Sequence, residues 1–123
     1  LKLFGASQFN LKNVDITIEQ YADFSLDISF KKPNGLPFPL TDYTGLSQLR
    51  LSPGSVEILA TFQVIFEEPR TLGKLKLTLH SATTATLNFF RGVYDLYLIK
   101  DGVRTRFLEG SVTLSRTVSK LLT

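Results

Sequence analysis

The chain has 123 residues, a length that suits one domain with a hydrophobic core that needs no disulfides or metals. Hydrophobic residues make up 43% and charged residues 20%, which is ordinary globular usage and too apolar for a disordered chain. There is no cysteine, which excludes disulfides, thiolate nucleophiles and cysteine metal sites. The net charge of +3 comes from Lys and Arg spread over separate segments, so we expect no nucleic-acid partner.

The sequence shows no membrane or targeting segment. No apolar run approaches the ~20 residues that span a bilayer, so no membrane partner is expected. The opening Leu1 to Gly5 is too short for the core of a signal peptide. Because the sequence contains no Met, we expect a processed, trimmed or partial chain whose true N-terminus is unknown.

Residues 1–13 are too apolar for a solvated tail, chiefly because of Leu3, Phe4, Phe9 and Leu11. They either add a strand to this domain or form an arm that pairs with a neighbouring subunit, and the sequence leaves both open. Residues 117–123 also lie outside the pattern that follows and are expected to form a C-terminal tail. The domain itself is predicted to span residues 14–116.

Alternation of apolar and polar residues with a period of two dominates that span, which is typical of half-buried strands. Seven strands are predicted, at residues 14–19, 24–31, 45–51, 57–66, 73–80, 92–100 and 103–115. Their number and spacing favour an all-β, immunoglobulin-like antiparallel β-sandwich. Turn residues separate the strands, above all Lys32-Pro33-Asn34-Gly35 and the two-residue hairpin signal Asp101-Gly102.

Three segments carry further structural expectations. Ser81 to Leu87 predicts a short helix near 81–88 that crosses between the two sheets, with Ser81 as N-cap. Gly110, near the middle of the long last strand, indicates a bulge or bend. The strand at 57–66 is apolar on both faces, so it is either central or packs its outer face on a partner, through residues such as Leu59 and Ile65.

A search for catalytic or metal-binding residues gives little. His80 is the only histidine, so a histidine metal site lacks a second ligand, and no Gly-x-Ser-x-Gly elbow accompanies it. Asp95 and Glu109 could lie on neighbouring strands, but each occupies the polar phase of its strand, where a solvated carboxylate is expected. We therefore expect no enzyme activity, no cofactor and no metal.

The tyrosines are the remaining candidates for ligand contacts. Tyr21 and Tyr43 lie in turns and could bind a ligand together with Phe38, in the loop at 34–40. Tyr97 shares the polar phase of its strand with Asp95, which indicates a contact surface. The simpler interpretation is that each Tyr packs its ring while its hydroxyl stays in water.

The order of segments resembles the small immunoglobulin-like structural proteins of tailed bacteriophages, in particular the N-terminal domain of the phage baseplate upper protein. The resemblance covers about residues 14–116, and its motifs are Asp15–Gln20, Phe24–Phe30, Asn34–Thr41, Tyr94-Asp95-Leu96, Asp101-Gly102 and Leu108-Glu109-Gly110. One departure is Tyr21, where the pattern has glycine after Gln20. The resemblance implies a virion component of the baseplate, tail, neck or fibre region, without catalytic residues.

Two functional hypotheses follow. The first is a non-enzymatic virion protein that packs with copies of itself and with other virion proteins through its N-terminal segment and the outer face of 57–66. The second is a host-surface glycan-binding module that uses Tyr21, Tyr43 and Phe38. The position in the virion, the copy number and the host are not readable from the sequence.

Overall fold

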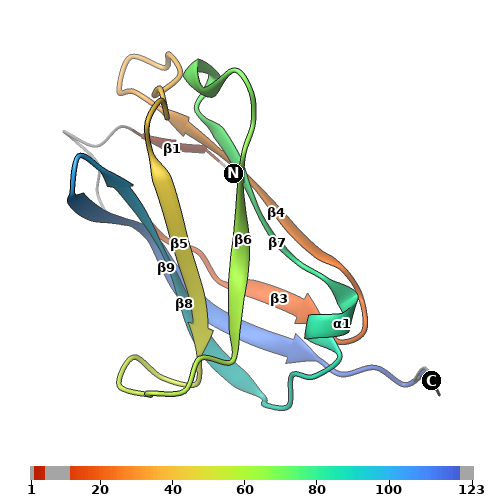
Figure 1. Ribbon diagram of the computed structural model, residues 1–123. Coiled ribbons are helices and arrows are strands. Elements are labelled where there is room, and N and C mark those ends of the chain that lie inside the picture. Colours follow the sequence, from red (N-terminus) through yellow and green to blue (C-terminus); the bar gives the residue numbers. More distant parts are fainter. Residues whose placement is uncertain (1, 5–11, 120–123) are drawn as a thin grey trace.

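The computed structural model describes residues 2–4 and 12–119 and shows an all-β sandwich (Figure 1). The strands are β1 (Lys2–Phe4), β2 (Lys12–Asn13), β3 (Ile16–Glu19), β4 (Phe24–Lys31), β5 (Thr44–Arg50), β6 (Ala60–Phe66), β7 (Lys74–Leu79), β8 (Arg91–Lys100) and β9 (Val103–Ser115). The helical elements are η2 (Arg70–Leu72) and α1 (Ser81–Thr84). Within these residues no helix is long and apolar enough to cross a membrane.

The strands form one hydrogen-bonded path, in the order β1-β4-β7-β6-β5-β8-β9-β2, with β3 also paired to β9. The path folds into two layers, because β6 changes partner along its length. Its first residues, Ala60 to Phe62, pair with β5, whereas Gln63 to Phe66 pair with β7. The two layers are therefore joined by main-chain hydrogen bonds as well as by the core.

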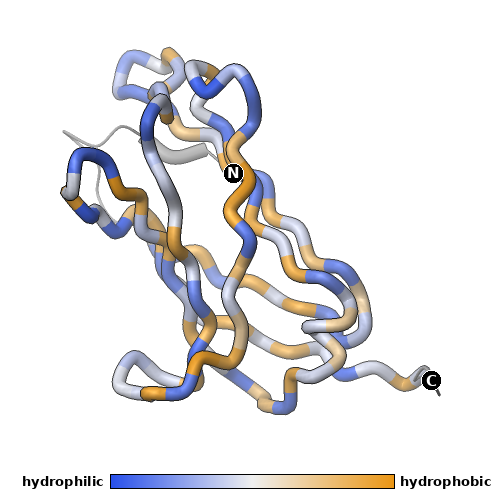
Figure 2. The backbone as a smooth tube through the Cα atoms, viewed as in Figure 1, coloured by the Kyte–Doolittle hydropathy of each residue, from blue (hydrophilic) through white to orange (hydrophobic). Residues whose placement is uncertain are grey.

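The period-two prediction is confirmed in the strands that carry the core. Hydropathy alternates along the backbone (Figure 2). The apolar residues of this alternation are largely the buried ones. The strands predicted at 24–31 and 103–115 have the predicted bounds, and β6 begins at Ala60 instead of at residue 57. The fully buried side chains include Ile18, Ile28, Phe30, Leu40, Leu49, Leu77, Leu96, Leu98, Phe107, Leu108 and Val112.

The N-terminal strands depart from the antiparallel pattern expected of the sandwich. β1 pairs in parallel with β4, and both β2 and β3 pair in parallel with β9. The sheet is therefore mixed. β1 and β2 are edge strands of different layers, so residues 2–4 pair with one layer and residues 12–13 with the other.

The crossover segment is shorter than predicted and its N-cap is different. α1 connects β7 in one layer to β8 in the other, as expected, but its N-cap residue is His80 and it spans only four residues. Ser81 is the first helical residue, and its backbone N–H donates to Asp23 Oδ1 at 2.7 Å. The prediction of Ser81 as N-cap was wrong, because the capping oxygen comes from a residue 58 positions earlier.

The turn chemistry is confirmed. Asp101 and Gly102 both have positive φ, 52° and 77°, as a primed two-residue hairpin requires. Gly35 has φ 86° and donates its N–H to the Lys32 carbonyl at 2.8 Å. Tyr21 has φ 68°, a left-handed conformation that glycine adopts at lower cost, which explains why glycine would suit this position.

The bulge in β9 lies three residues before the predicted position. Leu96 of β8 faces Leu108, and the next residue, Tyr97, faces Arg106, so Phe107 is the extra residue. Phe107 and Leu108 are consequently both buried although they are adjacent in sequence. The bulge is therefore in the predicted strand but not at Gly110, where the sequence indicated a bulge or bend.

Gly110 has a different role, since it allows two chain segments to approach closely. A Cβ added there would overlap with the carbonyl oxygen of Val14 and lie 3.1 Å from Cε1 of Tyr94. That carbonyl oxygen accepts a hydrogen bond of 2.7 Å from the Tyr94 hydroxyl. Asp15 Oδ1, next in sequence, accepts the backbone N–H of Ser111 at 2.9 Å.

We expect Gly110→Ala to lower the free energy of unfolding by about 2–3 kcal/mol, because backbone atoms cannot move away as a flexible side chain could. Gly54→Ala is the matched control, since a Cβ at Gly54 meets nothing within 4 Å. The control should stay within about 0.5 kcal/mol of the parent. Urea unfolding followed by circular dichroism measures both, and equal stabilities for the two variants would contradict the close-approach explanation.

Candidate functional site

A hollow of about 680 Å³ lies over the outward side of β5, β8 and β9. We call its lining the β5–β8–β9 face. The outward side chains that form it are Leu46, Gln48, Arg50, Val93, Asp95, Tyr97, Arg104, Arg106, Glu109 and Ser111. Most of them are half-buried, although no other layer of the described residues covers them.

The bulge at Phe107 determines which side chains of β9 reach this face. Before the bulge, Arg104 and Arg106 point outward; after it, Glu109 and Ser111 do, because the extra residue changes the phase of the strand. Arg106 and Glu109 therefore meet on one side, with Arg106 Nη1 3.5 Å from Glu109 Oε1. In a regular strand, two residues three apart would point to opposite faces.

Hydrogen bonds and ring contacts hold the arginines of the face in place. Arg50 donates from Nη1 to the carbonyl oxygens of Ser55 and Val56, at 2.8 and 3.0 Å, and from Nη2 to Gln48 Oε1 at 2.9 Å. The Arg104 guanidinium lies 4.6 Å from the centre of the Tyr97 ring. These contacts fix two cations without neutralising them with a carboxylate.

Asp95 lies at the centre of the face. Burial raises the pKa of its carboxyl, Arg106 opposes that rise, Glu109 adds to it, and Arg104 and Arg50 oppose it more weakly. Asp95 and Glu109 are direct cross-strand neighbours, an arrangement of like charges that costs stability. The expectation that Asp95 is simply solvated was therefore wrong, because the neighbouring side chains partly enclose it.

Asp15 and Tyr94 lie at one end of the hollow and belong to its framework. The backbone N–H of Ser111 holds the pKa of Asp15 below its usual range, and the Ser111 side chain and Arg91 act in the same direction. Burial raises the pKa of the Tyr94 hydroxyl, and the charge of Asp15 adds to the rise. Unlike the expected wet hydroxyl, that of Tyr94 donates to Val14.

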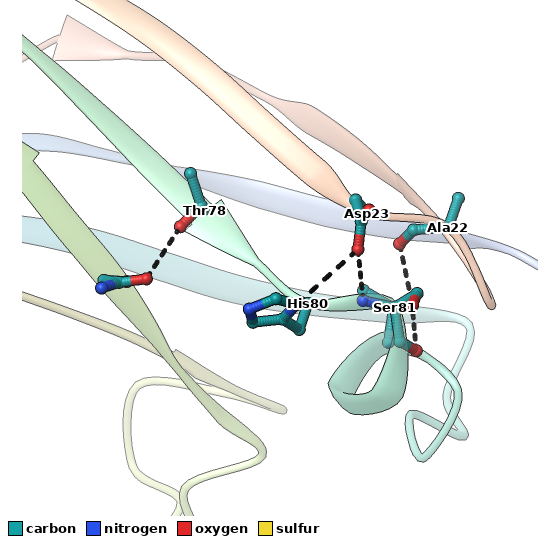
Figure 3. Close-up of polar contacts among 7 residues, drawn as sticks. Ala22, Asp23, Thr78, His80 and Ser81 are labelled. Carbon is teal, nitrogen blue, oxygen red and sulfur yellow. Dashed lines mark hydrogen bonds and ion pairs between the residues drawn. The ribbon is translucent and has the colours of Figure 1, made fainter.

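His80 lies in a small polar cluster at the start of α1 (Figure 3). Its Nδ1 is 4.0 Å from Asp23 Oδ1, too far for a hydrogen bond, and the two side chains are 87% and 77% exposed. Ser81 contributes its backbone N–H to Asp23. The arrangement is a helix cap, and it lacks the buried Asp–His hydrogen bond that a catalytic triad needs. In the part of the chain that the structure describes, no group of acids and histidines could hold a metal ion.

The structure does not bring the three aromatic candidates together. Phe38 and Tyr43 contact each other, with ring centres 6.1 Å apart, and both pack against Phe107. Lys100 lies 5.4 Å above the Tyr43 ring. Tyr21 is at the other end of β4, whose eight residues span roughly 25 Å.

The predicted partner contacts are distributed over several places. Leu3 and Phe4 belong to β1, beside β4, whereas Phe9 and Leu11 lie outside the described residues. Leu59 is half-buried and packs against the core. Ile65 is 43% exposed on the outer side of β6, where it lines a second hollow, of about 490 Å³, with Asp27 and Lys74 among others.

Sequence reasoning identified Tyr97 and Asp95 as sharing a face but missed the arginines around them. The usable signal was the pair of adjacent apolar residues Phe107-Leu108, which indicates a change of phase and places Arg106 and Glu109 together. The contribution of Arg50 had no such signal, since it depends on the course of the 51–59 loop.

No family model matches the chain, and no curated protein sequence matches it. Among solved structures, the N-terminal domain of phage TP901-1 ORF48 has a TM-score of 0.53 at 13% identity, over 93% of this chain and 94% of that chain. The chain therefore has the fold of a phage protein domain over nearly its whole length.

Two further matches fall below a TM-score of 0.5 and carry no argument. InlP of Listeria monocytogenes matches with a TM-score of 0.46 at 13% identity, over 84% of this chain and 26% of that chain. A DUF4784 family protein from Bacteroides caccae matches with a TM-score of 0.45 at 11% identity, over 86% and 23%.

The two carboxylates Asp15 and Asp95 should give opposite pH dependence of stability. Ionised Asp15 stabilises the fold above pH 3.8, and this is lost as the pH falls through its lowered pKa. Ionised Asp95 costs stability, a cost absent below pH 3.8 and fully present above its raised pKa. At pH 7, Asp15→Asn should therefore lower the melting temperature and Asp95→Asn should raise it.

Melting curves at pH 3, 5 and 7 check both signs. Asp95→Asn should approach the parent chain at pH 3, below the usual carboxyl pKa of 3.8, and the deficit of Asp15→Asn should shrink as the pH falls below 3.8. An Asp95→Asn variant that melts below the parent at pH 7 would show that the ionised carboxylate stabilises the face.

Proposed function

We propose that the chain is a non-enzymatic structural protein of a tailed-bacteriophage virion, from the baseplate, tail, neck or fibre region, which acts by packing with copies of itself and with other virion proteins. The observation that carries this proposal is the fold shared with a phage protein domain across nearly the full length of both chains. At 13% identity the likeness concerns the fold alone, so the role needs its own test.

The described side chains support a packing role over a catalytic one. Among the described residues, His80 occupies the N-cap position of a surface helix, and Asp23 supplies the acceptor for the backbone N–H of Ser81. Asp95 and Glu109 lie in an open face surrounded by arginines, which suits ion pairing with another molecule. Arginine and tyrosine, both present there, are enriched at the energetic centres of protein interfaces.

The glycan-binding alternative has less support. Tyr21 lies far from Tyr43 and Phe38, whose rings are engaged with each other and with Phe107. Sugar recognition by stacking needs a free aromatic face, and Lys100 covers one side of Tyr43. We expect a glycan array probed with the purified chain to give no signal above background; a reproducible hit lost in Tyr43→Ala would favour the alternative.

Virion membership can be tested directly. Particles purified on a density gradient from a strain carrying the gene should contain the chain, detected by mass spectrometry, and gold-labelled antibody should decorate the tail side of the particle. The major capsid protein is the positive control and an abundant host enzyme the negative one. Absence of the chain from purified particles, with capsid protein present, would contradict the proposal.

The N-terminal segment can be tested for a role in assembly by deleting residues 1–13 and measuring the mass in solution by light scattering. If the segment pairs with neighbouring copies, the deletion should reduce the oligomer to a smaller species. An unchanged mass, or a larger one caused by the uncovered edge of β4, would contradict that role. Removal of residues 118–123 serves as the control truncation.

A further inference from the structure

The register of the strands arranges the β5–β8–β9 face in three rows. One end row holds Leu46, Tyr97 and Arg106; the middle row holds Gln48, Asp95 and Glu109; the other end row holds Arg50, Val93 and Ser111. Arg104 lies over Tyr97 at the first end, and Arg91 lines the hollow at the second. Cations therefore lie at both ends of the face, with Asp95 and Glu109 between them, and Asp15 lies at the second end near Arg91.

The spacing of this pattern suits an extended chain. Val93 and Tyr97 mark the two end rows and are four residues apart along β8, roughly 13 Å at the rise of a strand. In a partner strand, side chains at positions i, i+2 and i+4 point to one side and cover the same length. One residue of such a segment would meet each row of the face.

The face is also prepared for binding. Three hydrogen bonds fix Arg50, the ring of Tyr97 supports Arg104, and Glu109 pairs with Arg106. Side chains that are already ordered lose little conformational entropy when a partner docks. The outward residues of the opposite layer, such as Lys74, are instead exposed to solvent.

A second copy of the chain is a poor occupant. A two-fold face-to-face pairing that aligns the strands and is centred on the middle row places end rows on end rows, arginine against arginine, and Asp95 against Asp95. Like charges in opposition disfavour a complex. The pattern is complementary to a different sequence.

A protein segment fits better than a sugar. Arg104 already covers a face of the Tyr97 ring. Beside Arg50, the 51–59 loop exposes the apolar side chains of Leu51 and Val56, which are 50% and 95% exposed. Arginine and tyrosine, both present on this face, are enriched at protein interfaces relative to the rest of a protein surface.

We propose that the β5–β8–β9 face binds an extended segment of a different protein that presents a carboxylate, a Lys or Arg, and a second carboxylate at positions i, i+2 and i+4. The outer carboxylates pair with Arg104 and Arg106 at one end and with Arg50 at the other, where Arg91 lies near Asp15. The central cation lies against Asp95 and Glu109. That the bound protein is a virion component rests on the proposed function. The charge pattern that the face would bind does not depend on the proposed function.

Two blocked peptides test the charge pattern, acetyl-Thr-Glu-Thr-Lys-Thr-Glu-Thr-amide and its inverse, acetyl-Thr-Lys-Thr-Glu-Thr-Lys-Thr-amide. Each is titrated at low salt into the isotope-labelled chain and followed by the backbone amide signals in nuclear magnetic resonance. The first peptide should shift amides of β5, β8 and β9 saturably, and added salt should weaken it. The inverse peptide should leave these amides unchanged.

A pair of variants locates the site. Arg104→Glu should weaken binding of the first peptide about tenfold, because it replaces an attraction with a repulsion. Lys74→Glu makes the same change of charge on the opposite layer and should alter binding less than about twofold. Circular dichroism confirms that both variants are folded before the titration.

Three results would overturn the proposal. They are equal binding of the two peptides, binding that Arg104→Glu leaves unchanged, and concentration-dependent shifts of the same amides in the free chain, which would indicate a second copy. If the first peptide binds as expected but the chain is absent from particles, the binding face stands and the virion role fails.

Discussion

The sandwich depends on how the chain from Val14 to Asp15 meets β9. Here the chain passes from β2 to β3, and the regular parallel ladder is interrupted. The carboxylate of Asp15 supplies the acceptor for the N–H of Ser111, and the Tyr94 hydroxyl supplies the donor for the carbonyl of Val14. Because unpaired main-chain polar groups are costly away from water, these two side chains make the crossing possible. Because Gly110 has no side chain, it leaves space for the carbonyl group of Val14.

β9, beside which residues 14 and 15 lie, also determines which charged side chains lie on the β5–β8–β9 face. The extra residue Phe107 in β9 allows both Phe107 and Leu108 to be buried. The outward residues are therefore even-numbered before the bulge and odd-numbered after it. The cost of the bulge is offset by burial of two consecutive large side chains. Its result on the outer surface is that Arg106 and Glu109 lie together beside Asp95. Packing inside the sandwich thus decides the charge pattern outside it.

The sequence was informative where structure is local. The strand at 24–31 and the Asp101-Gly102 hairpin follow from neighbours in the chain, so their patterns are readable. The cap of α1 by Asp23 and the parallel pairing of β3 with β9 join residues that are far apart in sequence, and no local pattern encodes them. The likeness to a phage protein domain in the structural comparison agrees with the resemblance seen in the motifs, whereas the narrower immunoglobulin-like and baseplate assignments stay predictions.

In the candidate site too, the features that depend on neighbours in the chain were predictable and those that depend on distant residues were not. The polar phase shared by Asp95 and Tyr97 was visible as alternation, and it correctly suggested a surface of interest. The half-burial of Asp95 was not visible, since it requires Arg104 and Arg106 to lie beside it and Arg50 to be held by the 51–59 loop. The long arginine side chains can partly bury Asp95 only where the backbone fold places them beside it.

The change of partner within β6 has a mechanical consequence. In a sandwich whose layers contact each other only through side chains, a shear force can slide one layer over the other by rearranging hydrophobic contacts. Here the strand that pairs with β5 through Phe62 pairs with β7 from Gln63 onward, so sliding would rupture main-chain hydrogen bonds in both ladders at once. The domain should therefore respond to tension as a single stiff body.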